Sequence, residues 1–175
     1  IFERPDVSLA EASVAKLDRI CRKLELGPGD RVVEIGGGWG SFALHAAANY
    51  GCHVTTTTVS REQYRLACAR VEEAGLTDRV TVLQQDYRDL RGRFDKLVSI
   101  EMIEAVGHAW LPTFLGTCAR LLEPHGQMLL QAITVADQRY EHLRRSVDFI
   151  QWFIFPGSLL NSVTVLCDTA TRHTD

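Results

Sequence analysis

The sequence lacks the features that mark several large classes of protein. Its five cysteines include no Cys-x-x-Cys pair, and no group of histidine and cysteine has metal-ligand spacing. We therefore expect reduced thiols and no metal site. There is no run of about 20 apolar residues and no signal-peptide pattern, so the sequence predicts neither a membrane span nor a secretory leader.

The sequence also has little net charge of either sign. The net charge is −3, with 23% charged and 46% hydrophobic residues. A chain this close to neutral has no global attraction for nucleic acid or anionic lipid, so any such contact needs a local patch. The 175 residues suffice for one domain with a substantial core. No closing element is evident before Asp175, so we expect a fragment of something longer.

What is present is organised around residues 31–40, Arg-Val-Val-Glu-Ile-Gly-Gly-Gly-Trp-Gly. This stretch predicts a short buried strand that runs into a glycine-rich turn, and residues 41–48 then open a helix. Glycines at alternate positions, Gly36, Gly38 and Gly40, allow positive φ and let a ligand lie against the main chain. A strand, a glycine turn and a helix in this order build a nucleotide site at the carboxyl edge of a parallel sheet.

The rest of the chain repeats the alternation of strand and helix. Two N-terminal helix signals have capping-box spacing, Ser8 with Glu11 and Ser60 with Gln63. Five strands alternating with helices predict an α/β doubly wound domain. The expected strands are residues 31–35, 53–59, 80–83, 94–100 and 128–133.

The glycine turn does not have the form that binds a dinucleotide. The third glycine of that fingerprint would fall at Ser41, and the tip of the second strand, Thr57-Thr58, carries no acid for a ribose. The form Glu-x-Gly-x-Gly-x-Gly from Glu34 to Gly40 instead resembles motif I of the S-adenosylmethionine-dependent methyltransferases.

Four stretches read together make the resemblance more specific. They resemble the cyclopropane-fatty-acyl-phospholipid synthase and mycolic acid cyclopropane synthase family over nearly the whole chain. The resemblance implies a Rossmann-like doubly wound class I methyltransferase fold, truncated at both ends. It implies a single methyltransferase domain over 1–175, divided into an N-terminal helix region (1–30), a cofactor-binding core (31–133) and a lid or acyl-pocket segment (134–175). The stretches are residues 54–63, 94–108, 129–134 and 148–157.

The resemblance also implies which residues hold the cofactor, S-adenosylmethionine. Motif I would approach its methionine part, and a hydroxyl and an amide its ribose. An acid and an aromatic ring would contact its adenine, and an aliphatic side chain would pack against the cofactor. For Gln63 the alternative is a bond to the backbone of its own helix cap. The implied residues are Glu34, Gly36, Gly37, Gly38, Thr58, Gln63, Asp86, Tyr87 and Ile100.

The family's chemistry implies a second set of residues. Methyl transfer to a cis double bond leaves a carbocation, so the site must exclude water and hold a base. In the family this base is understood to be a bound bicarbonate. Carried over, its glutamate is Glu104, its main-chain isoleucine is Ile133, and its histidine position is Gln131, a departure. The family's cysteine would precede Ile1 and its tyrosine would follow Asp175.

The expected function is methyl or methylene transfer to the cis double bond of unsaturated phospholipid acyl chains, forming cyclopropane fatty acids. The alternatives are a fatty-acid C-methyltransferase that leaves a methyl or methylene branch, a small-molecule methyltransferase of the same fold, and a remnant without activity. The implied partners are the acyl chain and, transiently, a membrane surface, with no nucleic acid. The implied location is cytoplasmic, with contact at the inner face of the membrane.

Several residues near the expected site carry two interpretations. Glu101 is either a like charge that raises the pKa of Glu104 or a solvated loop acid. His108 is either a local acid or base or a structural loop residue.

The last part of the chain has two segments of open role. Arg139, Arg144 and Arg145 either meet lipid phosphate or form a solvated helix face. The aromatic run 149–155 is either a buried helix end or a lid over an apolar pocket.

Overall fold

The computed structural model describes residue 2 and residues 4–174. The prediction that the sequence is a fragment without a closing element concerns Asp175, which lies outside the described residues. Its centre is a five-stranded parallel sheet in the order β3-β2-β1-β4-β5. The strands are β1 (Arg31–Ile35), β2 (His53–Thr58), β3 (Val80–Gln84), β4 (Phe94–Ile100) and β5 (Leu122–Gln131). The order reverses between β1 and β4, which confirms the predicted doubly wound fold and places its switch point beside the glycine turn.

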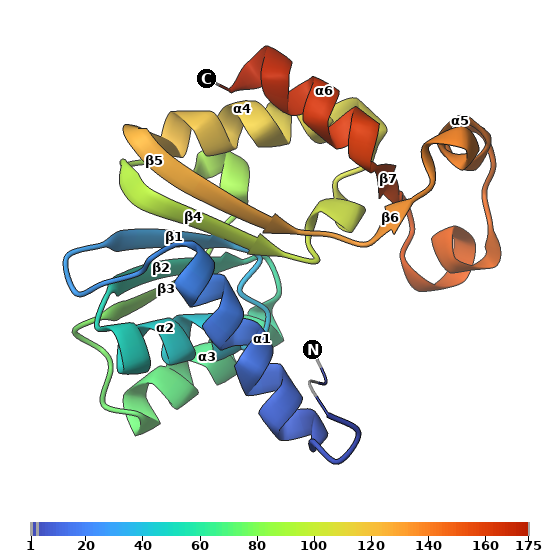
Figure 1. The fold of residues 1–175 in the computed structure, drawn as a ribbon. Helices are drawn as coiled ribbons and strands as arrows, with labels where there is room; N and C mark the ends of the chain where they lie inside the picture. Colours follow the sequence, from blue (N-terminus) through green and yellow to red (C-terminus); the bar gives the residue numbers. More distant parts are fainter. Residues whose placement is uncertain (1, 3, 175) are drawn as a thin grey trace.

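Helices cover both faces of this sheet (Figure 1). On one face, α1 (Leu9–Lys23), α2 (Ser41–Tyr50) and α3 (Arg61–Glu73) enclose one apolar cluster with β1 and β2. On the other face, α4 (Leu111–Leu121) and α6 (Val163–His173) enclose a second cluster with β1 and β4. The sequence did not predict α6, which packs along α4 and closes the second face.

The two predicted capping boxes have different outcomes. In α1 the box is complete, because Ser8 Oγ accepts from the Glu11 N–H at 3.2 Å and the Ser8 N–H donates to Glu11 at 2.9 Å. In α3 only half of it forms: Ser60 Oγ accepts from the Gln63 N–H at 3.3 Å. The Ser60 N–H donates instead to Thr58 Oγ1 at 3.1 Å. The second prediction is therefore wrong for the Gln63 side chain, which is free to serve elsewhere.

The fifth strand begins earlier than predicted. β5 pairs through Leu122 with Phe94 and then, after a shift of register, through Gln127 with Lys96. The residues between them, which include Pro124 and Gly126, bulge out of the ladder and interrupt the strand without ending it. Ile133 lies beyond the C-terminal end of this strand.

A separate excursion follows the sheet. A short parallel pair, β6 (Thr134–Val135) with β7 (Asn161–Ser162), closes a loop that contains α5 (Asp137–Arg145) and a π-helical turn over Ile150–Ile154. Figure 1 shows this loop standing away from the sheet.

The interpretation of residues 149–155 as a buried helix end is wrong. The aromatic side chains of the run are all between 63% and 67% exposed: Phe149, Trp152, Phe153 and Phe155.

Candidate functional site

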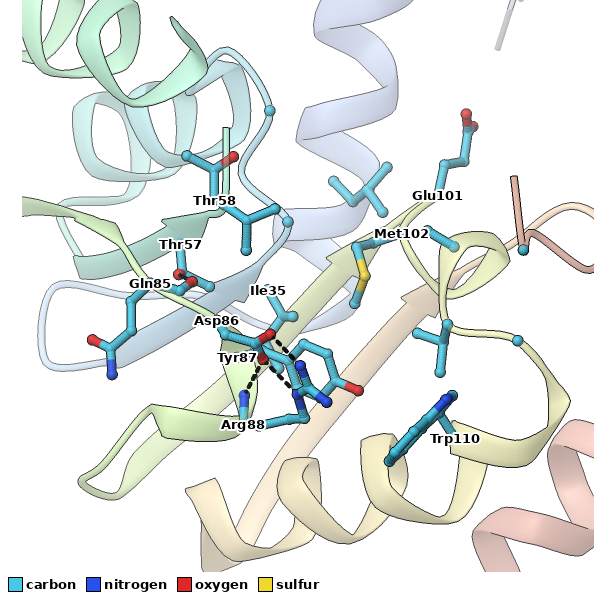
Figure 2. A pocket seen from close by; sticks show the side chains of 18 of the residues that line it. Ile35, Thr57, Thr58, Gln85, Asp86, Tyr87, Arg88, Glu101, Met102 and Trp110 are labelled. Carbon is cyan, nitrogen blue, oxygen red and sulfur yellow. Dashed lines mark hydrogen bonds and ion pairs between the residues drawn. The ribbon is translucent and has the colours of Figure 1, made fainter. Parts of the chain in front are cut away.

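A cavity of about 770 Å³ lies at the carboxyl ends of the central strands. Its walls come from the turn after β1, the end of β2, the residues after β3 and the segment 100–110 after β4 (Figure 2). This is the edge at which open α/β sheets bind ligands, because strand order reverses there and leaves a crevice.

The glycine turn forms one wall through its main chain. Gly36 and Gly38 line the cavity with φ of +87° and +53°, a region that favours glycine. A Cβ on Gly38 would meet no atom within 4 Å, so its backbone is open to close approach by a ligand. A Cβ on Gly36 would lie 2.6 Å from Met102 Cγ, so this glycine serves the packing of the turn against the segment after β4.

Glu34 and Gly37 lie behind the turn and do not line the cavity. Glu34 is 2% exposed, and its Oε2 accepts from Thr56 Oγ1 at 2.6 Å. Burial raises the pKa of Glu34 to about 7, and the Thr56 hydrogen bond offsets only part of that shift. A Cβ on Gly37 would overlap Thr56 Oγ1 and lie 3.1 Å from Glu34 Oε2. Both residues therefore support the turn from behind, and direct contact of either with a cofactor stays a prediction.

The predicted ribose-binding pair is brought together at the end of β2. Thr58 Oγ1 donates to Gln63 Oε1 at 2.7 Å, and both residues line the cavity. The alternative for Gln63, a bond to the backbone of its own helix cap, does not form. Because Oε1 is used by Thr58, the Gln63 Nε2 is the part of this amide that remains for a ligand hydroxyl.

The predicted adenine-binding residues also line the cavity, but Asp86 already has a partner (Figure 2). The Asp86 carboxylate accepts from the Arg88 N–H and Nε, both at 2.9 Å, and from Arg88 Nη2 at 2.7 Å. These bonds hold the pKa of Asp86 below its usual range. The Arg88 guanidinium also lies over the Trp110 ring, 5.7 Å from its centroid, and Tyr87 packs edge-on against Phe114.

The end of β4 completes the cavity on the far side of the switch point. Ile100, which the resemblance placed against the cofactor, lines the wall together with Glu101 and Met102. Figure 2 shows Glu101 on a different side of the cavity from Asp86 and Arg88.

The predicted catalytic residues form two separate hydrogen-bonded pairs next to this wall. Glu104 Oε1 accepts from the Ile133 N–H at 2.6 Å, and Gln131 Nε2 donates to Glu101 Oε1 at 2.5 Å. The second oxygen of Glu104, Oε2, is buried and has no partner among the described residues. The two acids therefore have separate donors, one from the β5 strand end and one from the chain beyond it.

The contacts of His108 and of two arginines of α5 bear on their alternatives, while the role of Arg139 stays a prediction. The His108 Nδ1 lies 2.6 Å from the hydroxyl of Tyr140, a side chain only 3% exposed, which favours the structural interpretation. Arg144 and Arg145 pair with Glu141 at 2.8 Å and 3.2 Å, as a solvated helix face does.

Sequence reasoning missed Arg88, Met102 and Trp110. The spacing of Asp86 and Arg88 allowed a local ion pair to be foreseen, whereas Trp110 reaches the cavity only through the course of the chain after β4. In the described part of the chain, no group of three or more histidine, cysteine, aspartate or glutamate side chains is placed to hold a metal ion.

Comparison with known proteins covers the whole fold. The family model described as "Mycolic acid cyclopropane synthetase" matches residues 1–174. The chain is 42% identical over 166 residues to tuberculostearic acid methyltransferase UfaA1 of Mycobacterium tuberculosis, a match over 95% of this chain and 39% of that protein. It is 41% identical over 167 residues to the cyclopropane-fatty-acyl-phospholipid synthase of Escherichia coli, over 95% of this chain and 41% of that protein.

Solved structures agree with these matches. Mycolic acid cyclopropane synthase CmaA1, complexed with SAH and CTAB, superposes with a TM-score of 0.89 at 31% identity and covers 98% of this chain and 64% of that one. The cyclopropane synthase MmaA2 from Mycobacterium tuberculosis gives 0.88 at 28% identity, with the same coverage. The chain thus spans about two fifths of the length of the curated relatives above.

Proposed function

Because the chain belongs to the mycolic acid cyclopropane synthetase family, we propose that the protein transfers the methyl group of S-adenosylmethionine to a cis double bond in the acyl chain of a phospholipid. The product proposed first is a cyclopropane fatty acid. The observation that carries the proposal is the cavity at the switch point, with an open glycine main chain on one wall and apolar side chains opposite.

The residues present fit S-adenosylmethionine. This cofactor has no phosphate, and the open backbone of Gly38 allows the close approach that its methionine part requires. Gln63 lines the part of the cavity proposed for the ribose, and Tyr87 and Trp110 supply aromatic rings for the part proposed for the adenine. For Asp86 to accept from the adenine amino group, it must do so with a lone pair that Arg88 leaves free.

The proposed chemistry requires mainly that the site position the methyl donor next to the double bond and exclude water. When bound, S-adenosylmethionine supplies a methyl group on a sulfonium sulfur, an electrophile strong enough for an alkene. Ile100 and Met102 line the cavity with apolar surface, as a site that protects a carbocation from water requires. The roles of Glu104, Gln131 and Ile133 near the reacting carbon remain predictions.

The residues present do not fit a bound bicarbonate. The two donors of this chain expected to hold it are the Gln131 amide and the Ile133 N–H. Both are bonded instead to carboxylates of the chain, Glu101 and Glu104. With these two donors engaged, neither the Gln131 amide nor the Ile133 N–H is left to bind a further anion. No step is therefore assigned to bicarbonate.

We include contact with a membrane surface in the proposal, on the cytoplasmic side as the family resemblance implies. Among the described residues, no helix is long and apolar enough to cross a bilayer. The exposed run 149–155 instead offers aromatic side chains of the kind that settle at the lipid–water interface. We expect Trp152→Ala to weaken sedimentation with phosphatidylcholine vesicles several-fold, and Trp39→Ala, at an exposed site outside the run, to leave it unchanged.

The direct test is methylation of a lipid. The protein is incubated with S-adenosylmethionine carrying a CD3 group and with vesicles of dioleoyl phosphatidylcholine, and the acyl chains are analysed by mass spectrometry. A ring or methylene product gains one carbon and keeps two deuterium atoms. Label that appears only on soluble acceptors would contradict the proposal and favour a small-molecule methyltransferase.

A second acyl product is favoured by one comparison. The relative with 42% identity is a tuberculostearic acid methyltransferase, so a methyl or methylene branch is the alternative to a ring. Proton NMR of the product separates the two, because cyclopropane protons resonate upfield of all other acyl protons.

A further inference from the structure

We propose that Glu101 accepts the proton that leaves the transferred methyl group, so that the chain carries its own base where the family resemblance implies an added bicarbonate. The inference rests on the proposed function and names a residue of that same site. Three observations lead to it: the backbone of Glu101, its hydrogen bonds and its position on the cavity wall.

The backbone of Glu101 is in the left-handed region, which is unfavourable for a residue other than glycine. Its φ is +50°, and among the described residues every other position with positive φ is a glycine, except Glu25. A non-glycine residue is strained there, and such strain persists where function requires the side chain. The turn out of β4 needs this conformation, but glycine would provide it without strain. A glutamate at this position therefore has a reason other than the turn.

Two hydrogen bonds with Gln131 hold Glu101 in place, one through its main chain and one through its carboxylate. Its N–H donates to the Gln131 carbonyl at 2.8 Å, which continues the β4–β5 ladder by one residue. The Gln131 side chain returns the contact, because its Nε2 donates to Glu101 Oε1 at 2.5 Å. Only one carboxylate oxygen is used in this way, so Oε2 remains as a proton acceptor.

The position of Glu101 separates it from the other acids of the site. Glu101 lines the cavity, directly after Ile100 and before Met102. Glu104 does not line it, and its carboxylate is held by the Ile133 N–H. Asp86 lines it but is engaged by Arg88 on another side. Of these three carboxylates, only Glu101 both belongs to a residue that lines the cavity and lacks a cationic partner among the described residues.

The step balances without any added reagent. One alkene carbon bonds the methyl carbon as the sulfonium sulfur keeps the electron pair of the C–S bond, and the neighbouring carbon becomes cationic. A proton of the new methyl group passes to Glu101 Oε2, and the electron pair of that C–H bond closes the ring. The products are the cyclopropane, the neutral thioether and a protonated Glu101, which returns its proton to water.

Two substitutions test this role in different ways. Glu101→Gln keeps an oxygen for Gln131 and the same backbone but cannot take a proton, so we expect turnover to fall about 100-fold or more while SAH affinity, measured by calorimetry, stays within threefold. Glu101→Gly removes both the base and the strain. We expect the same loss of turnover together with a melting temperature raised by about 2–4 °C. Sodium formate should restore at least tenfold of that activity, and sodium chloride at equal ionic strength should not.

Glu25 provides the matched control. It has the same strained backbone, with φ of +54°, at the C-terminus of α1 and away from the cavity. Glu25→Gly should raise the melting temperature to a similar extent and leave turnover unchanged. The inference is overturned if Glu101→Gln keeps turnover within threefold of the wild type, if it loses SAH affinity in parallel with turnover, or if formate fails to rescue Glu101→Gly. If the wild-type protein itself labels no lipid, the proposed function fails first and the inference with it.

Discussion

The buried carboxyl of Glu34 makes the stability of the protein depend on pH in an unusual direction. Glu34 sits behind the glycine turn, and burial raises its pKa from 4.5 to about 7. The native state therefore keeps this proton to a higher pH than the unfolded chain does. Its contribution to stability is present in full below about pH 4.5 and is lost as the pH rises through about 7. Most buried ion-paired carboxylates act in the opposite sense.

The size of the effect follows from the shift. A difference of about 2.5 pKa units corresponds to about 3 kcal/mol at full ionisation, and about 2 kcal/mol of it falls between pH 5.5 and 8. Glu34→Gln keeps the shape and an oxygen that accepts the Thr56 hydroxyl but has no proton to lose. We therefore expect the free energy of unfolding of Glu34→Gln to gain about 2 kcal/mol on that of the wild type over this pH range.

Urea denaturation followed by circular dichroism at several pH values measures this difference. Other titrating groups contribute equally to both proteins, so only the gap between the two curves matters. The hydrogen bond from Thr56 lowers the pKa of Glu34, so Thr56→Val should raise that pKa further. The change with pH in the difference in unfolding free energy between proteins with Glu34 and with Gln at position 34 should then become larger. Thr56→Ser keeps the hydroxyl and should leave this difference as it is. Parallel curves for wild type and Glu34→Gln from pH 5.5 to 8 would show that Glu34 is not a buried neutral acid.

Three further substitutions probe the backbone. Glu25→Gly should raise the free energy of unfolding by about 1 kcal/mol in thermal or urea melts, because glycine removes the strain of φ +54°; a decrease would contradict this. Gly37→Ala should lower it by about 1–3 kcal/mol, since its Cβ overlaps Thr56 Oγ1 behind the turn. Gly38→Ala meets no atom, so its main effect should be weaker SAH binding in calorimetry, together with about 1 kcal/mol of strain from φ +53°. Unchanged SAH affinity would remove Gly38 from the cofactor wall.

The order of strands and helices could be predicted from the chain because local signals agree with the tertiary arrangement. β1, with the sequence Arg-Val-Val-Glu-Ile, is buried from Val32 to Ile35 and runs into a glycine turn, as a buried parallel strand followed by a tight turn does. Ser8 with Glu11 specified the start of α1 through contacts within four residues. The position of the cavity followed as well, since carboxyl ends of parallel strands meet at one edge.

What the local pattern could not specify was the partner of each polar side chain. The capping-box spacing predicts that the Gln63 side chain bonds the backbone of its own helix cap, yet it accepts a hydrogen bond from Thr58. Gln131 looked like a donor for a bound anion, but the strained turn after β4 brings the Glu101 carboxylate to it. The same spacing in the sequence is compatible with either partner.

Only the tertiary structure decided between these partners, because a hydrogen bond depends on atoms from segments that lie 30 residues apart, as Gln131 and Glu101 do. Apolar periodicity and glycine placement act over a few residues and so determined the fold and the location of the site. Which acid faces the cavity and which is held behind it depends on how β4 and β5 register. The place of Glu101, on which the proposed proton transfer depends, is therefore a property of that pairing, which the sequence pattern did not contain.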